Sequence, residues 1–214
     1  MPRKRIIRCS NRPYHITSRS NNKDWFSIGL EKIWPKFLWL ISDGISEFKI
    51  SPHCFVLMSN HYHLLLTTPL ENVDTFMQFF NHRLSLFIGG QSQRINRIFG
   101  GRYKSSLIKD DSHYLQVYKY VYQNPVRAIL CEKIENYPFS SFHEEKMSTI
   151  LKLEINKNKN LLLPESLQGK SSELNFLNQF YSNDNVNIIR KGLRKTEYGL
   201  AADPVTKRLP IIYL

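Results

Sequence analysis

Hydrophobic residues recur along the first part of the chain with two different periods. Residues 14–19 alternate apolar and polar side chains and are rich in strand-forming residue types, whereas 25–41 and 71–87 repeat apolar residues at helical spacing. The apolar stretch 48–68 is interrupted at Ser59-Asn60, which indicates a hairpin. In chain order the pattern predicts a strand at 14–19, a helix at 25–41, a strand pair within 48–68, a helix at 71–87, a strand at 102–108 and a helix from 110 or 111 to about 124. This order predicts an α+β fold, in which helices cover one face of a mainly antiparallel sheet.

The chain from residue 144 to residue 214 has weaker patterning. The polar run from Asn156 to Asn160 is a candidate linker. Residues 171–181 and 185–198 are predicted as short helices, so we expect a helical C-terminal extension. The second helix carries four basic side chains, which either help to hold a polyanion or form a solvated face: Arg190, Lys191, Arg194 and Lys195.

Charge narrows the choice of partner. The 214 residues contain 30 Lys+Arg against 18 Asp+Glu, a net charge of +12, and the pI is near 9.6. Seven of the basic side chains lie within the first 24 residues, and six lie within 82–109, where the sequence has no acid. Two same-sign clusters interleaved with aromatic residues favour a nucleic-acid partner over a solvated surface.

Other features of the composition exclude several classes of protein. No apolar stretch approaches the roughly 20 residues that span a bilayer, and the basic N-terminal segment does not lead into an apolar export segment. We therefore expect a cytoplasmic protein with no membrane partner. Cys9, Cys54 and Cys131 are scattered and form no Cys-x-x-Cys pair, which argues against a disulfide framework and against a thiolate zinc site.

A pair of histidines lies within the second strand of the predicted hairpin. His61 and His63 are two residues apart, so their imidazoles point to the same face of the strand and could chelate a metal ion. An exposed pair on an edge strand would have the same spacing. Two imidazoles do not complete a metal site, so a third ligand must come from elsewhere in the chain.

The predicted helix that ends near Asn124 supplies candidates for the rest of the site. Its helical projection places Tyr114, Tyr118 and Tyr122 in an apolar arc and Tyr120 on the polar face. A phenol can attack a phosphodiester as a nucleophile. Asn124 follows Tyr120 by one helical turn and could offer an amide oxygen to a divalent ion, which would act as a Lewis acid on the phosphate.

With these residues in view, the chain resembles the HUH-type single-tyrosine transposases, especially the REP-associated tyrosine transposases. The resemblance spans about residues 12–142 and supports a catalytic domain at 1–143. Five blocks carry it in order: Arg12-Pro-Tyr-His-Ile-Thr-Ser-Arg19, Val56-Leu-Met-Ser-Asn-His-Tyr-His-Leu-Leu65, Gly101-Arg-Tyr-Lys-Ser105, Tyr120-Val-Tyr-Gln-Asn-Pro-Val-Arg-Ala128 and Tyr137-Pro-Phe-Ser-Ser141. Ser59 and Ser20 depart from the family pattern, where Pro and Gly are usual, but both are turn positions.

The resemblance implies a fold, a site and a reaction. The fold is a ferredoxin-like or RRM-like domain, and the substrate is single-stranded DNA, often beside a hairpin, cleaved to a 5′-phosphotyrosine and a free 3′-hydroxyl. Members of the family act as monomers or as homodimers. The implied roles are Tyr120 as nucleophile, His61, His63 and Asn124 as ligands of Mg²⁺ or Mn²⁺, and His15, Arg19, Arg97, Arg102 and Lys104 as the surface that follows the DNA phosphates.

Two alternatives from other function classes remain open. The chain could be a domesticated transposase that binds nucleic acid without catalysis, although the presence of all four site residues argues against a degenerate site. It could also be a zinc hydrolase built on His61 and His63, although the sequence offers no evident acidic third ligand.

Overall fold

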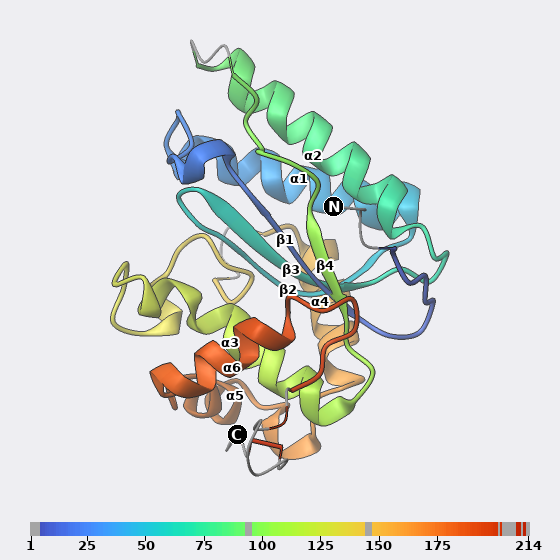
Figure 1. Cartoon of the computed structure of the whole chain (residues 1–214), viewed down its shortest axis with the longest axis vertical. Coiled ribbons are helices and arrows are strands. Elements are labelled where there is room, and N and C mark those ends of the chain that lie inside the picture. The colour runs from blue at the N-terminus through green and yellow to red at the C-terminus, as the bar shows by residue number, and fades with distance from the viewer. Residues whose placement is uncertain are drawn as a thin grey trace.

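The computed structural model describes residues 5–92, 96–143, 147–200, 202, 209–210 and 212. Figure 1 shows the elements in chain order. They are β1 (Tyr14–Arg19), the short 3-10 helix η1 (Asn21–Lys23), α1 (Leu30–Phe48), β2 (Ser51–Leu57), β3 (His61–Thr67), α2 (Val73–Gly90), β4 (Lys104–Leu107), α3 (Asp111–Arg127), η2 (Ile134–Asn136), α4 (Thr149–Asn160), η4 (Glu165–Leu167), α5 (Lys170–Leu177) and α6 (Asn183–Gly192). None of the helices within these residues is long and apolar enough to cross a membrane.

The strands form an antiparallel sheet, as the sequence predicts. Within the described residues the strand order is β2-β3-β1-β4, and β1 pairs with both β3 and β4. The hairpin predicted at Ser59-Asn60 is confirmed, since β2 and β3 are antiparallel neighbours joined at these residues. The two central strands are therefore β3 and β1. They carry His61 and His63 (β3) and His15 (β1).

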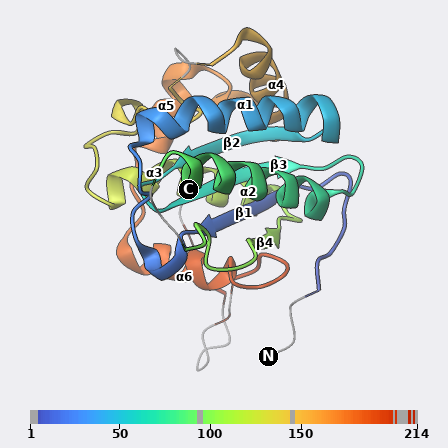
Figure 2. The ribbon, with the colours of Figure 1, turned by 90° about the horizontal axis from the view of Figure 1, so that it is seen from above.

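Helices cover both faces of this sheet, which corrects the prediction that they lie on one face. Figure 1 shows α1 and α2 above the strands and α3, α5 and α6 below them, and Figure 2 shows α1 and α2 over the strands from above. The upper core contains Phe37, Phe55, Tyr62 and Phe80, among others. The lower core joins Val56 and Leu65 of the sheet to tyrosines of α3 and to apolar residues of α5 and α6. The upper face of the inner strands is apolar, and on the lower face Val56 of β2 and Leu65 of β3 are buried as well, so each face is covered by a helical layer.

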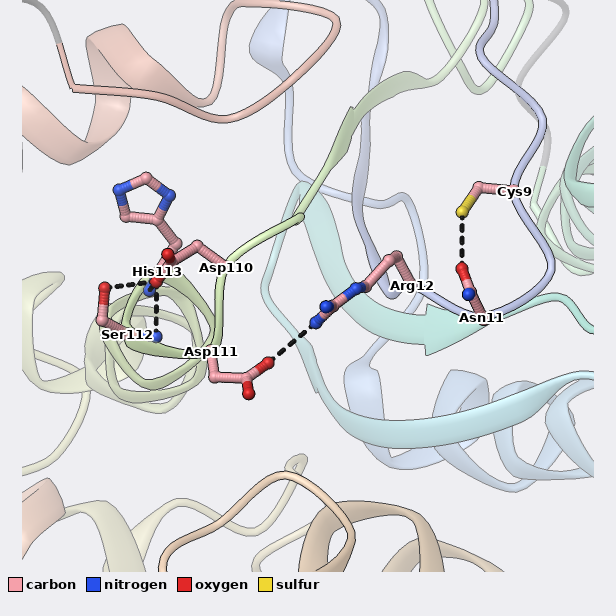
Figure 3. Close-up of polar contacts among 7 residues, drawn as sticks. All are labelled: Cys9, Asn11, Arg12, Asp110, Asp111, Ser112 and His113. Atoms are coloured by element: carbon pink, nitrogen blue, oxygen red, sulfur yellow. Dashed lines mark hydrogen bonds and ion pairs between the residues drawn. The ribbon is translucent and has the colours of Figure 1, made fainter.

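The start of α3 is fixed to the segment that leads into β1. Figure 3 shows the Asp110 carboxylate accepting hydrogen bonds from the backbone N–H groups of Ser112 and His113, an N-terminal cap that confirms the predicted helix start. Arg12 reaches across to Asp111, with Nη1 and Oδ1 2.8 Å apart. This ion pair is largely exposed and contributes little stability, but it joins the two segments that carry His15 and Tyr120.

The C-terminal extension packs on the rest of the chain and contributes to its core. Helix α4 lies against β2, where Asn158 Nδ2 donates to the Pro52 carbonyl at 3.2 Å. The expected linker at 156–160 is therefore wrong, because these residues end α4. Residues 196–198 run beside β4: the Leu107 N–H donates to Thr196 O at 2.9 Å, and the Tyr198 N–H donates to Leu107 O at 2.8 Å. The predicted domain boundary after residue 143 falls at 144–146. These positions lie outside the residues that the structure describes, so the boundary stays a prediction.

Candidate active site

The sheet brings three histidines to the face that α3 covers. In the pairing of β1 with β3, Arg19 lies opposite His61 and Thr17 lies opposite His63, so the side chains of His15, His61 and His63 share one face. The expectation from the spacing of two residues is confirmed for His61 and His63. His63 and His15 are 5% and 3% exposed, so neither belongs to an open edge strand.

Each histidine of the pair has a hydrogen-bond partner at Nδ1. The Nδ1 atom of His63 lies 2.9 Å from Nε2 of His15, and Nδ1 of His61 lies 2.6 Å from Oδ1 of Asn60. Burial lowers the pKa of His61 to about 3, with a smaller contribution from the Arg19 charge, and burial lowers the pKa of His15 to about 3. The pKa of His63 is well below its ordinary value, again chiefly because of burial. All three imidazoles are therefore neutral near pH 7.

Helix α3 places Tyr120 and Asn124 against this pair. The Tyr120 ring meets the rings of His63 and His15 edge-on, with centroid separations of 5.9 Å and 6.1 Å. Asn124 Nδ2 donates to the carbonyls of Tyr120 at 2.8 Å and Val121 at 3.3 Å. Pro125 has no N–H for the Val121 carbonyl, so the Asn124 side chain replaces that helical bond. This explains why α3 continues to Arg127 through Pro125, beyond its predicted end, and it turns Asn124 Oδ1 away from the helix backbone.

These side chains surround one cavity of about 740 Å³. Its walls come from β1, β3, the segment before and at the start of β4, the C-terminal half of α3, and α6. Among the described residues that line it, every one with a full charge is basic: Arg19, Arg102, Lys104, Arg127, Arg190 and Arg194. A cavity with cationic walls and a phenol beside neutral imidazoles suits a phosphodiester substrate.

All of the residues predicted for the site line this cavity, except Arg97. Arg97 is exposed and lies outside it. His15, expected to contact DNA phosphates, lines the cavity but is buried and bonded to His63. Arg127 was missed, although it follows Asn124 by three residues and therefore lies on the same side of α3. Of the four basic side chains expected on the last helix, Arg190 and Arg194 reach the cavity.

The donor set would offer a divalent cation two nitrogens and one oxygen, fewer oxygen ligands than Mg²⁺ prefers, so the oxygens of a bound phosphate would have to complete the site. Two neutral imidazole nitrogens and one amide oxygen are available at His61, His63 and Asn124. Among the described residues no group of three or more His, Cys, Asp or Glu side chains is placed to hold a metal ion. An amide third ligand is less typical of a structural zinc site than a histidine or carboxylate would be.

The comparisons with known proteins agree with each other. No family model matches the chain. A relative from Haemophilus influenzae, provisionally named a REP-associated tyrosine transposase, is 26% identical over 106 residues, which cover 44% of this chain and 60% of the relative. A solved structure, of a REP-associated tyrosine transposase bound to a REP hairpin, matches with a TM-score of 0.58 and 18% identity over 68% of this chain and 85% of that one.

The resemblance to REP-associated tyrosine transposases is confirmed. The structural match shows that the chain shares the α+β fold of these transposases, so the predicted α+β class with an antiparallel sheet is confirmed as well. The chain spans about three-fifths of the length of the H. influenzae transposase.

Proposed function

We propose that the protein is a metal-dependent transposase that cleaves and rejoins single-stranded DNA next to a hairpin. The observation that carries the proposal is the basic cavity in which Tyr120 and Asn124 of α3 face His61 and His63 of β3. The names of the sequence relative and of the solved structure support this function, and the hairpin bound in the latter supports hairpin DNA as the substrate.

Tyr120 would act as the nucleophile. Its phenolic oxygen forms a bond to the phosphorus of the scissile phosphodiester while the bond from phosphorus to O3′ breaks. The phenol releases its proton to solvent and the departing O3′ takes one up, so the products are a 5′-phosphotyrosine and a free 3′-hydroxyl. Attack by another 3′-hydroxyl on the phosphotyrosine reverses the exchange and joins two DNA ends without an external energy source.

His61, His63 and Asn124 would hold Mg²⁺ or Mn²⁺. When bound, the ion polarises the phosphate oxygens as a Lewis acid. The neutral imidazoles offer lone pairs at pH 7, and the Asn124 amide keeps its orientation through the two backbone carbonyls to which it donates. Asn124 therefore positions a ligand oxygen one helical turn from the nucleophile.

The basic side chains of the cavity wall would bind the DNA backbone. Arg19 and Lys104 come from the sheet, Arg127 from α3, and Arg190 from the C-terminal extension. Phosphate contacts of this kind fix the strand without reading its sequence. Because Tyr120 and the histidine pair of the same chain face each other, we propose that one chain can cleave DNA without a tyrosine from a second copy.

The proposal is tested by trapping the covalent intermediate. Labelled single-stranded hairpin DNA is incubated with the protein and Mn²⁺ or Mg²⁺ and separated on a denaturing gel. Wild type and Tyr122→Phe should form an adduct, because Tyr122 is buried with its hydroxyl on Ser141, whereas Tyr120→Phe should form none. Tight binding without an adduct across a range of hairpins would indicate the non-catalytic alternative, and cleavage without linkage would indicate a hydrolase.

A further inference from the structure

We propose that Asn60 and His15 are positioning residues that fix the ring tautomers of His61 and His63, so that both imidazoles direct an unprotonated Nε2 toward the cavity. This inference rests on the proposed function. It gives His15 a role other than the phosphate contact predicted from the sequence. Each tautomer is set by which atom of the hydrogen bond carries the proton.

The tautomer of His61 follows from the orientation of the Asn60 amide. Asn60 Nδ2 donates to the Lys23 carbonyl at 2.7 Å, so Oδ1 is the atom that faces Nδ1 of His61 at 2.6 Å. An amide oxygen only accepts hydrogen bonds, so Nδ1 of His61 carries the proton and Nε2 does not. The guanidinium of Arg19, which only donates, lies 3.4 Å from that Nε2 and agrees with this assignment.

The tautomer of His63 depends on the direction of its bond to His15. If Nδ1 of His63 donates to Nε2 of His15, Nε2 of His63 is left bare. The opposite direction would put the proton on Nε2 of His63 and block that atom as a ligand. The two rings stack with centroids 5.1 Å apart, and β1 holds His15 between β3 and β4, so Nε2 of His15 is held beside Nδ1 of His63.

Both histidines would then have the arrangement usual for metal-ligating imidazoles. Such a ligand donates its other ring N–H to a nearby acceptor, and loss of that acceptor typically costs about 10- to 100-fold in metal affinity. We therefore expect His15→Phe to weaken Mn²⁺ binding by about that factor. His15→Gln offers an amide oxygen as an acceptor and should restore most of the affinity.

The test measures tautomers and metal affinity separately in the full chain. Long-range ¹H–¹⁵N NMR of the metal-free wild type should show His61 and His63 both protonated on Nδ1. In His15→Phe, His63 should change tautomer, and Mn²⁺ titration by electron paramagnetic resonance should show the weaker binding. His53→Phe is the matched control, because His53 is as buried as His15 but bonds to Thr67 and Tyr114 away from the cavity.

Two outcomes would overturn the inference: a proton on Nε2 of His63 in the wild type, or unchanged tautomer and Mn²⁺ affinity in His15→Phe. The wild-type spectrum decides the first point even if a variant fails to fold. Failure of the proposed function is distinguishable, since it would appear as a missing DNA adduct in a protein whose histidines have the expected tautomers and bind Mn²⁺.

Discussion

Gln123 connects α3 to the C-terminal extension, and its removal should loosen that extension. The side chain is fully buried. Its Nε2 donates to the carbonyls of Leu177 at 2.9 Å and Gln179 at 3.0 Å, and its Oε1 accepts from the Tyr181 N–H at 3.2 Å. These bonds hold the segment between α5 and α6, so Gln123→Ala should destabilise the fold and displace the arginines of α6.

The magnitude follows from the three bonds. A neutral hydrogen bond contributes about 1 kcal/mol net, and a buried backbone group left without a partner costs about 1–3 kcal/mol. The substitution should therefore lower the free energy of unfolding by roughly 3–5 kcal/mol. In a chain of this size each kcal/mol corresponds to about 2–4 °C in Tm, so the drop should be of the order of 10 °C.

Urea and thermal unfolding measure this effect, with Gln168→Ala as the matched control. Gln168 also donates to two backbone carbonyls, of Asn160 and Leu163, both at 3.2 Å, but its side chain is exposed. Water can replace its bonds, so the control should lose less than about 1 kcal/mol. Equal losses in the two variants would refute the reasoning that Gln123 holds the extension in place.

Three further predictions concern charge. Lys159→Met should destabilise the fold by about 3–5 kcal/mol, because it removes the partner 2.7 Å from the buried carboxylate of Glu173; urea unfolding measures this, and addition of Glu173→Gln should recover part of the loss. Arg190→Gln should weaken binding to single-stranded DNA and reduce the slope of log K against log salt by about 0.7, whereas Arg97→Gln, outside the cavity, should change the slope less. The free energy of unfolding should fall above pH 10. Burial raises the pKa of tyrosines, that of Tyr14 to about 12, so the folded state keeps protons that the unfolded state loses. A constant free energy of unfolding between pH 10 and 12 would contradict this prediction.

Local signals account for the parts of the fold that the sequence predicts. Alternation predicts β1, the interruption of an apolar stretch at Ser59-Asn60 predicts the hairpin, and helical periodicity predicts α1 and α2. Asp110 marks the start of α3. The end of α3 was predicted less accurately than its start, because a side chain there replaces a hydrogen bond that the backbone cannot make. Asn124 donates to Val121 O where Pro125 cannot, and α3 therefore passes the predicted end.

Contacts between distant residues account for the errors. The polar run at 156–160 has no apolar period, yet it is helical because Lys159 pairs with Glu173 and Asn158 bonds to Pro52, which lies 106 residues away. The helical projection places Tyr120 on the polar face of α3. In the structure the C-terminal extension bonds to Gln116 and Gln123 of this face, and Tyr120 packs against His15 and His63 and is only 5% exposed. No local pattern encodes such coverage.

The candidate site was predictable where spacing within one element sufficed. The separation of His61 from His63 and of Tyr120 from Asn124 fixed their shared faces, and the structure brings the two pairs together. The bond between His15 and His63 depends on the pairing of β1 with β3 and could not be predicted from either strand alone. Spacing along α3 alone would have placed Arg127 beside Asn124, but its proximity to Arg190 of α6 could not be predicted from either helix alone.

The most direct test of the account is to locate the DNA on the protein by mass spectrometry of the trapped adduct. Cleavage after Lys119 and Arg127 releases the peptide Tyr120–Arg127, which contains Tyr120 and Tyr122. We predict that fragmentation places the 5′-phosphate of the DNA on Tyr120. A nucleotide on Tyr122, or on any other residue, would contradict it.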